Sequence, residues 1–406
     1  MNWRSAFEFF LSFRQAQPIM KQMQKRRVPR VLISGGAGFI GVNAARRFQK
    51  DNWDVFIWDN LSRPGAESNL RWLRSLGPVR FSKLDIRSEK AVNQHFERER
   101  YDLVLHCAGQ VAVSASLVNP RHDLENNLLG TFNLLEAARR FCPGALFIFA
   151  STNKVYGSLT DVTVTERNGR YEWAGFPEGI PESHPLDFHS PYACSKGAAD
   201  QYVRDYSRIY GLATVCFRQS CIYGHRQFGL EDQGWVAWFL IAHALRRPIT
   251  IFGDGKQTRD LLFIDDLIEA YRLAWQKRDV VAGQVYNIGG GPENKYSVRQ
   301  LVHWLETEGG APVEINFAAA RQGDQRVFVA DVRKAFADFG WRPACSVEQG
   351  IRELHRWVND HVVLLREVIA PPPVPERAPA LVSTSLGIVW PSAGAPVRAR
   401  NKQPAG

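Results

Sequence analysis

Short runs of β-branched and aromatic residues alternate with longer segments of helical spacing from residue 30 onward. The strands that these runs predict cover residues 30–34, 54–59, 79–85, 103–108, 145–151 and 213–218. Between the strands, apolar residues recur every three or four positions, and this spacing is typical of helices with one buried face. The alternation predicts an α/β fold in which a doubly wound parallel sheet carries helices on both faces.

The rhythm changes after about residue 220, where the loops lengthen. We predict a helix around 235–247, short strands at 250–253 and 285–289, and helices around 297–308 and 346–365. The predicted parts are an N-terminal extension (1–29), a nucleotide-binding domain with the catalytic residues (30–220), a smaller α/β lobe (221–365), and a tail (366–406). The lobe is expected to bind substrate, with some segments returning to the first domain. The Pro/Ala-rich tail is expected to be disordered, because it can bury little surface.

Composition narrows the class of protein further. The 406 residues carry a net charge of +10, and part of this excess lies at the two ends of the chain, where it is expected to be solvated. The six cysteines include no Cys-x-x-Cys pair, so we expect no zinc site, and cysteines in apolar runs suit a reducing compartment. No apolar stretch approaches the roughly 20 residues of a membrane span, and no basic patch is interleaved with aromatic residues. We therefore expect a cytoplasmic protein without a metal, a membrane span or a nucleic-acid partner.

The first strand leads directly into GGAGFIG, which places Gly35, Gly38 and Gly41 at the start of a helix. Glycines at this spacing permit a tight turn and let the backbone approach a pyrophosphate at the positive end of the helix. Asp59 closes the second strand, where a carboxylate can accept hydrogen bonds from ribose hydroxyls and would repel a 2′-phosphate. This combination predicts a dinucleotide site and favours NAD over NADP as the cofactor.

Further cofactor contacts are expected where the third and fourth strands end. Asp85 and Ile86 can hold the adenine edge, although Asp85 can also cap the helix that follows. Small residues at 108 and 109 let the backbone lie against the cofactor. The predicted cofactor residues in this part of the chain are Gly35, Gly38, Phe39, Ile40, Gly41, Asp59, Asn60, Asp85, Ile86, Ala108 and Gln110.

Tyr192 and Lys196 lie one helical turn apart in SPYACSKGAADQY, so their side chains share a helix face. A tyrosine is a poor base at pH 7 because its ordinary pKa is near 10, but an adjacent ammonium group and a positive nicotinamide ring would lower that pKa. Tyr192 could then remove a proton from a sugar hydroxyl while hydride leaves the carbon. Thr152, at the end of the fifth strand, could hold the same sugar oxygen. A Tyr-x-x-x-Lys pair alone is more often a surface pair, but its combination with the glycine motif and Thr152 favours catalysis.

The ordered set of GGAGFIG, Asp59, HCAG, NNLLGT, STNKVYG, SPYACSK and RQGD resembles the extended short-chain dehydrogenases, the NAD-dependent sugar-nucleotide epimerases and dehydratases, over about residues 30–365. Longer strings, such as DNLSRPGAESNLRWL and LDFHSPYACSKGAADQY, resemble the members that epimerise a CDP-linked dideoxyhexose at C2. The resemblance implies a Rossmann-type sheet, NAD as the cofactor, a nucleotide-sugar substrate, and a homodimer or homotetramer. It also implies that Asn127 approaches the cofactor and that Tyr192 and Lys196 contact it, Lys196 at the nicotinamide ribose.

The same resemblance assigns substrate residues. Arg259 and Arg321 would hold the diphosphate, with Asp324 near the nucleotide ribose, because planar guanidinium groups can bind a diphosphate in bidentate fashion. The alternatives are an ion pair between Arg259 and Asp260, and a local salt bridge between Arg321 and Asp324. In a neighbouring segment, Gln233 and Trp235 would line the nucleotide pocket, although Trp235 and Trp238 can equally belong to the core of their helix.

One departure from the family pattern bears on the reaction. The 4,6-dehydratases of this family carry Asp-Glu directly after the catalytic threonine, whereas Asn153 and Lys154 stand here. No carboxylic acid is present at these positions to protonate a leaving hydroxyl, so dehydration is disfavoured. The segment 158–189 is expected to form a loop over the sugar, with His184 and His189 stabilising that loop or touching substrate.

Together with the catalytic residues, the resemblance implies an NAD-dependent nucleotide-sugar epimerase that oxidises C2 transiently to a 2-keto sugar and returns hydride to the opposite face. One alternative keeps the fold but makes the chain a 4-epimerase or reductase that acts on a UDP-, GDP- or dTDP-sugar. Another alternative, from a different class, is a non-catalytic scaffold that binds NAD or a nucleotide.

Overall fold

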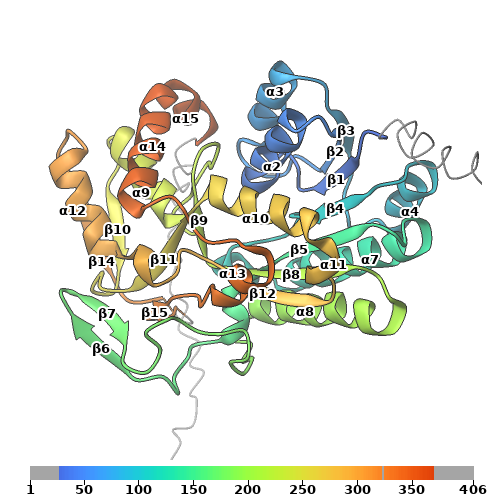
Figure 1. Cartoon of the computed structure of the whole chain (residues 1–406). Helices are drawn as coiled ribbons and strands as arrows, with labels where there is room; N and C mark the ends of the chain where they lie inside the picture. The colour runs from blue at the N-terminus through green and yellow to red at the C-terminus, as the bar shows by residue number, and fades with distance from the viewer. Residues whose placement is uncertain (1–26, 322–323, 370–406) are drawn as a thin grey trace, which may run out of the picture. The chain divides into compact units, whose positions relative to one another are not determined.

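The computed structural model describes residues 27–321 and 324–369, and a seven-stranded sheet lies at its centre (Figure 1). The strand order is β12-β8-β5-β4-β1-β2-β3, and every pairing is parallel. All six strands predicted for the nucleotide-binding domain are present, with ends that differ by at most two residues. The strands are β1 (Arg30–Ser34), β2 (Asp54–Asp59), β3 (Arg80–Lys83), β4 (Leu103–His106), β5 (Leu146–Thr152), β8 (Thr214–Gln219) and β12 (Gln284–Ile288).

Helices cover both faces of this sheet, which confirms the predicted doubly wound, Rossmann-type fold. Val31 and Ile33 belong to one hydrophobic cluster, whereas Leu32 between them belongs to the other, because successive side chains of a strand point to opposite faces. The first cluster contains α2 (Phe39–Lys50), α3 (Ala66–Leu76) and α10 (Ile264–Gln276). The second contains α4 (Glu89–Arg98), α7 (Gly130–Phe141) and α8 (Pro191–Tyr210). Two short helices, α5 (Val113–Val118) and α6 (Pro120–Leu124), and a π-helical turn at Glu125–Leu129 join β4 to α7.

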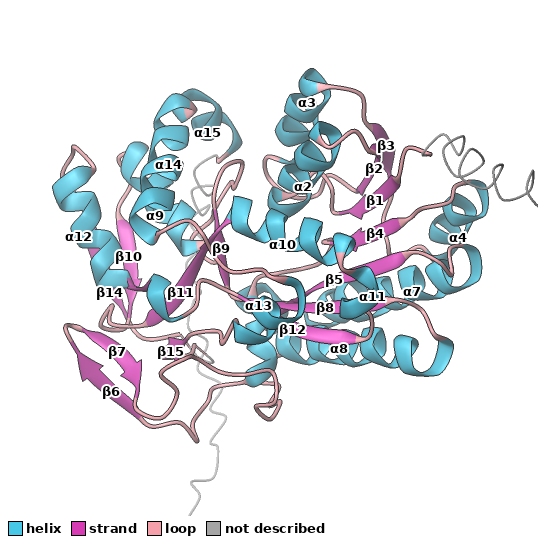
Figure 2. Cartoon of the chain, in the orientation of Figure 1, coloured by secondary structure: helices cyan, strands magenta, loops and turns pink. Residues whose placement is uncertain are grey.

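The second half of the chain adds two smaller sheets (Figure 2). One sheet contains β9 (Cys221–Tyr223), β11 (Thr258–Phe263), β13 (Lys295–Ser297) and β15 (Val327–Phe328), and the other pairs β10 (Ile249–Phe252) with β14 (Ile315–Ala318). The remaining helices of this half are α9 (Trp235–Ala244), α11 (Arg278–Val281), α12 (Val298–Glu308), α13 (Arg333–Phe339), α14 (Val347–Asp360) and α15 (Val362–Val368). The cluster that contains β1 runs on through α9 and α10 to α14, so the division at residue 220 stays a prediction.

Several local expectations differ from the structure. The strand expected at 285–289 within the smaller lobe is β12, which lies at the edge of the main sheet beside β8. The expected loop at 158–189 contains an antiparallel hairpin, β6 (Val164–Arg167) and β7 (Arg170–Trp173). Residues 366–368 of the predicted tail belong to α15, and Ile369 is buried. The rest of that tail, and the extension at 1–26, lie outside the described residues.

Candidate active site

The glycine-rich loop runs from β1 into α2 and shapes the predicted dinucleotide site. Gly35 has a φ of +70° and donates its N–H to the Trp58 carbonyl at 2.8 Å. A Cβ atom on Gly41 would lie 2.2 Å from the Gly35 carbonyl oxygen, so the turn can pack against the helix only without a side chain there. Gly38 caps α2, whose first turn carries no acidic residue. This helix terminus therefore offers N–H groups and the positive end of a helix dipole to an anion.

One pocket brings together most of the predicted cofactor residues. It is lined by Gly35, Gly38, Phe39, Ile40, Gly41, Asp59, Asn60, Asp85, Ile86, Ala108 and Gln110, which come from the ends of four parallel strands, and by Gln233 of the second half. Asn127, Tyr192 and Lys196 do not line this pocket. Asn127 instead contacts a residue of the pocket wall, Gln110, whose N–H donates a hydrogen bond to Asn127 Oδ1 at 3.0 Å.

Asp59 is held in place by backbone donors. Its two carboxylate oxygens accept hydrogen bonds from the N–H groups of Leu61 at 2.8 Å and Ala37 at 3.0 Å. Burial raises the pKa of Asp59, and these backbone contacts oppose that effect. Each oxygen retains a lone pair that can accept a ribose hydroxyl. The geometry is thus compatible with the predicted preference for a ribose without a 2′-phosphate.

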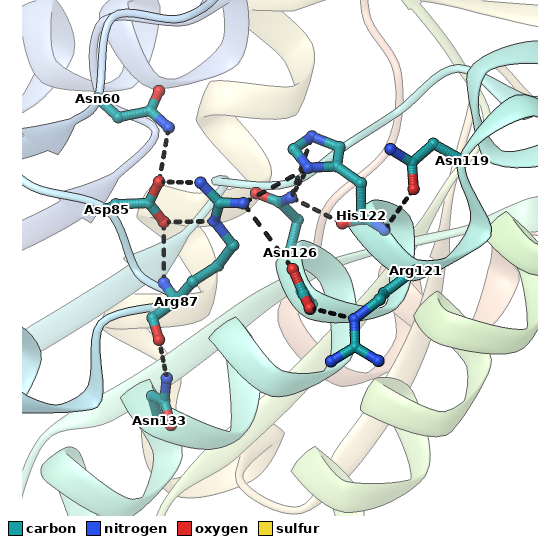
Figure 3. Close-up of polar contacts among 9 residues, drawn as sticks. Asn60, Asp85, Arg87, Asn119, Arg121, His122, Asn126 and Asn133 are labelled. Carbon is teal, nitrogen blue, oxygen red and sulfur yellow. Dashed lines mark hydrogen bonds and ion pairs between the residues drawn. The ribbon is translucent and has the colours of Figure 1, made fainter.

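Asp85, which also lines the pocket, makes more hydrogen bonds than the sequence suggested (Figure 3). Its oxygens accept three hydrogen bonds from Arg87, at 2.7–3.0 Å, and one from Asn60 Nδ2 at 3.2 Å. The Arg87 guanidinium holds the pKa of Asp85 down at about 2. Four bonds fill the acceptor positions of a carboxylate, so an adenine amino group would have to compete with Arg87. The alternative role as a helix cap is wrong, because Ser88 caps α4.

The predicted catalytic residues Thr152 and Tyr192 lie side by side. Thr152 is the last residue of β5, and Tyr192 is the second residue of α8, where Ser190 caps the helix and Pro191 begins it. Burial raises the pKa of Tyr192 to about 12, although the Thr152 hydroxyl beside it lowers that pKa. The two hydroxyl groups therefore lie close enough to act on the same substrate oxygen, which stays a prediction.

Lys196 is buried one turn further along α8. Its Nζ donates a hydrogen bond to the Ala150 carbonyl at 2.6 Å and lies 4.1 Å from the ring centroid of Phe149. Burial lowers the pKa of Lys196 to about 8. The sequence had suggested that Lys196 lowers the pKa of Tyr192, but the structure shows no such coupling and burial dominates for both groups. The lowering of the Tyr192 pKa by Lys196 and the nicotinamide ring therefore stays a prediction.

A buried carboxylate next to this pair was missed. Asp123 is fully buried and accepts hydrogen bonds from Ser195 Oγ, from Asn127 Nδ2 at 3.0 Å and from Gln110 Nε2 at 3.1 Å. Burial raises the pKa of Asp123. Its charge in turn raises the pKa of Tyr192. In the sequence, Asp123 reads as an ordinary polar residue of a helix, and no motif distinguishes it.

Two of the predicted substrate residues, Arg259 and Asp324, form an ion pair. Arg259 Nη2 lies 2.7 Å from Asp324 Oδ1, and Lys154 Nζ lies 3.6 Å from the same oxygen. Arg321 stacks on the ring of Phe252, with 3.7 Å between Cζ and the centroid. The two alternative ion pairs, Arg259 with Asp260 and Arg321 with Asp324, are not formed by the side chains in the described part of the chain. Asp260 is fully buried and bonds to Ser220 and to backbone N–H groups rather than to Arg259. Among the described contacts, the Asp324 carboxylate pairs with Arg259 and Lys154, whereas Asp324 contacts Arg321 through the backbone, its N–H donating to the Arg321 carbonyl at 3.3 Å.

The two residues expected to line the nucleotide pocket have different environments. Gln233 lines the pocket of the glycine loop, whereas Trp235 packs edge-on against Phe239 within α9, at 5.7 Å between centroids. Trp238 is likewise packed against the main hydrophobic cluster. His184 contacts the rings of Tyr156 and Phe176, and His189 bonds to Asp187 and Ser158, so both histidines stabilise the segment 158–189.

The parallel sheet, the glycine loop at its carboxyl edge and the Tyr–Lys pair define a dinucleotide-dependent oxidoreductase scaffold. The model of the NAD dependent epimerase/dehydratase family matches residues 31–289, and the chain belongs to this family. It is therefore an enzyme of that family, and NAD is its cofactor, as the sequence predicted.

Individual relatives narrow the comparison. CDP-paratose 2-epimerase of Salmonella typhi is 43% identical over 335 residues, which cover 81% of this chain and 99% of that protein. A putative UDP-glucose 4-epimerase of Methanocaldococcus jannaschii is 30% identical over 333 residues, covering 82% and 99%. UDP-glucose 4-epimerase of Thermotoga maritima, solved with UDP-glucose, superposes with a TM-score of 0.71 at 30% identity and covers 82% of this chain and 99% of that one. The Thermus thermophilus UDP-glucose 4-epimerase complex with NAD gives a TM-score of 0.68 at 31% identity, covering 81% and 98%.

Two further features of the structure concern membrane-spanning helices and metal sites. Among the described residues, no helix combines the length and apolar character needed to cross a membrane. Within residues 27–321 and 324–369, no group of three or more His, Cys, Asp or Glu side chains is arranged to hold a metal ion.

Proposed function

We propose that the chain is an NAD-dependent 2-epimerase that acts on a CDP-linked dideoxyhexose, as CDP-paratose 2-epimerase does. The observation that carries this proposal is the 43% identity to that enzyme along 99% of its length. The arrangement of Thr152 and Tyr192 at the end of β5 supports the chemistry, because both side chains can bind one sugar hydroxyl.

NAD fits the residues of the glycine-loop pocket. The α2 N-terminus would hold its pyrophosphate, Asp59 a ribose, and the segment around Ile86 and Ala108 its adenosine side. When bound, NAD supplies the acceptor, and later the donor, of the hydride. Tyr192, Lys196 and Asn127 would complete the nicotinamide side of the site from α8 and the π-helical turn.

Tyr192 acts as the base that removes the proton of the C2 hydroxyl and returns it after inversion. Thr152 holds the oxygen of that hydroxyl and stabilises the phenolate through its own hydroxyl. Lys196 keeps a positive charge in the buried site, anchored on the Ala150 carbonyl. The 2-keto sugar turns within the site, so that hydride can return to its other face. The diphosphate stays bound meanwhile by Arg259 and Arg321.

The residues after Thr152 favour epimerisation over dehydration. Asn153 Nδ2 faces Gln325 Oε1 at 3.4 Å, and Lys154 pairs with Asp324 at 3.6 Å. Neither side chain is a carboxylic acid that could protonate a leaving hydroxyl. An elimination would therefore lack its general acid at these positions.

A C4-specific reaction is the second candidate, because relatives at 30% identity include a putative UDP-glucose 4-epimerase. Incubation of the full chain with CDP-paratose and, separately, UDP-glucose distinguishes the two, with proton NMR following the configuration at C2 and C4. We expect inversion at C2 of the CDP sugar alone, without net consumption of NAD, and loss of this activity in Tyr192→Phe. Inversion at C4 of the UDP sugar, or stoichiometric consumption of NAD, would refute the proposal. If the parent chain inverts neither sugar and Tyr192→Phe changes nothing, the non-catalytic alternative stands.

We also propose that the enzyme is a homo-oligomer that pairs through α7 and α8. Phe132, Tyr202, Ile209 and Tyr210 are exposed on these helices, and exposed apolar side chains grouped on neighbouring helices favour association. Sedimentation equilibrium tests this. A monomer at micromolar concentration would contradict it, and Ile209→Glu should shift a dimer towards monomer.

A further inference from the structure

A buried arginine lines the dinucleotide pocket without a partner for its charge among the described residues. Arg226 is 7% exposed, and its backbone adopts a φ of +64°, which is strained for a residue with a side chain. Burial lowers its pKa to about 10, and no neighbouring carboxylate offsets that effect in the described part of the chain. A buried cation without a counter-charge is unfavourable, so the site fits an anion that the protein itself does not supply.

Two tryptophans orient the guanidinium of Arg226 without satisfying it. Its Cζ lies 4.1 Å from the ring centroid of Trp72 on α3 and 6.0 Å from that of Trp357 on α14. Aromatic faces attract a guanidinium and fix its plane, but they offer no acceptor in that plane. The N–H donors of the guanidinium are therefore left for a planar or tetrahedral oxyanion.

The Asn69 side chain joins the backbone of Arg226 to the glycine loop. Asn69 Nδ2 donates hydrogen bonds to the Ala37 carbonyl at 3.1 Å and to the Arg226 carbonyl at 3.3 Å. Asn43 Nδ2 of α2 donates to the His225 carbonyl at 2.9 Å. These amides join the segment after β9 to the helix terminus at which a dinucleotide pyrophosphate binds in folds of this class.

We propose that Arg226 binds the pyrophosphate of the dinucleotide, and so makes the second half of the chain part of the cofactor site. A 2′-phosphate is the less suitable anion, because the Asp59 carboxylate lines the same pocket and would repel it. The proposal rests on the proposed function only for the presence of NAD. A chain that binds NAD through Arg226 but does not invert C2 would refute that function and leave this assignment intact.

Calorimetric titration of the full chain with NAD, ADP, NADP and adenosine, without any sugar nucleotide, tests the assignment. In Arg226→Met we expect the affinities for NAD and ADP to fall together, by roughly 10- to 100-fold, the effect of losing one charge-assisted contact. Adenosine, which carries no phosphate, should bind the variant and the parent equally. Arg278→Met is the matched control, since Arg278 also stacks on a tryptophan, Trp275 at 4.9 Å, but does not line the pocket.

Unchanged affinity for NAD in Arg226→Met would overturn the proposal, and so would a loss confined to NADP, which would place the side chain at a 2′-phosphate. A lower melting temperature with unchanged NAD affinity would identify a purely structural aromatic clamp. If the Met variant does not fold, Arg226→Lys retains the charge but loses the planar fork. We then expect an intermediate loss of NAD affinity, and equal affinity would again overturn the assignment.

Discussion

Arg259 donates a hydrogen bond of 2.7 Å to Asp324, and Lys154 approaches the same carboxylate oxygen at 3.6 Å. One negative charge thus lies between two positive ones. Burial, together with the charge of Arg259, lowers the pKa of Lys154 to about 8. The excess positive charge favours an anionic substrate at this position.

The first prediction concerns Arg259. Arg259→Met should raise the KM of the CDP sugar by about 10- to 100-fold and change kcat little, because a diphosphate contact far from the reacting carbon acts equally in the ground and transition states. Steady-state kinetics measure both constants. Arg326→Met is the control, since Arg326 is exposed and stacks on Tyr171. An unchanged KM, or a loss confined to kcat, would contradict the assigned role.

The second prediction concerns the pH dependence of the reaction. The charge of Asp123 raises the pKa of Tyr192, so its removal in Asp123→Asn should lower that pKa. Since the phenolate is the proposed base, the acidic limb of the pH profile of kcat/KM should move to lower pH in the variant. Thr152→Val should move it to higher pH, because the Thr152 hydroxyl lowers the pKa of Tyr192. Identical profiles for all three proteins would show that Tyr192 is not the titrating base.

A third prediction concerns the ion pair beneath the active site. Arg218 donates two hydrogen bonds of 3.0 Å to Asp200, and their side chains are 2% and 0% exposed. Asp200→Asn leaves the Arg218 charge buried without a partner, so the free energy of unfolding should fall by about 3–5 kcal/mol. Urea unfolding measures this. In Asp200→Leu/Arg218→Met, apolar side chains replace both charges and should restore much of the loss; a double variant less stable than Asp200→Asn would contradict this explanation.

The sheet and the glycine loop could be predicted from the sequence because their signals are local. Buried parallel strands such as β4 appear as uninterrupted apolar runs, and the loop at 35–41 needs its glycines within seven positions. The strands of the hairpin β6–β7 are short and half exposed, so they leave no apolar alternation to recognise. β12 has an ordinary strand pattern, but nothing in that pattern says which sheet it joins.

Residues of the site could be predicted from the sequence only where they belong to one short motif. Tyr192 and Lys196 share one helix, whereas the contacts of Asp123, Lys154 and Arg226 join segments up to 170 residues apart. The direction in which the Tyr192 pKa shifts could not be inferred either. It depends on how deeply the side chain is buried, and spacing along a helix does not reveal this. These contacts and the pKa of Tyr192 depend on which distant segments pack together and bury the side chain, and residue type alone does not show this.

The last prediction concerns Asp260, whose carboxylate is fully buried and binds three segments together. Its Oδ2 accepts the N–H groups of Gly291 at 3.2 Å and Ala330 at 3.0 Å, and its Oδ1 bonds to Ser220. Burial raises its pKa from the ordinary value of 3.8 to about 6. The folded chain therefore binds a proton more readily than the unfolded chain. The stability from this proton is complete below about pH 4 and is lost as the pH rises through about 6.

Asp260→Asn should remove this pH dependence without losing the contacts. An amide oxygen can accept both backbone N–H groups, and the amide nitrogen can donate to the Ser220 hydroxyl. Above pH 7 the variant should exceed the parent in free energy of unfolding by up to about 3 kcal/mol, since one pKa unit corresponds to about 1.4 kcal/mol. Urea unfolding from pH 4 to 8 measures the difference, with the exposed Asp279→Asn as the control. Parallel pH profiles for Asp260→Asn and the parent would mean that Asp260 keeps an ordinary pKa in the folded chain.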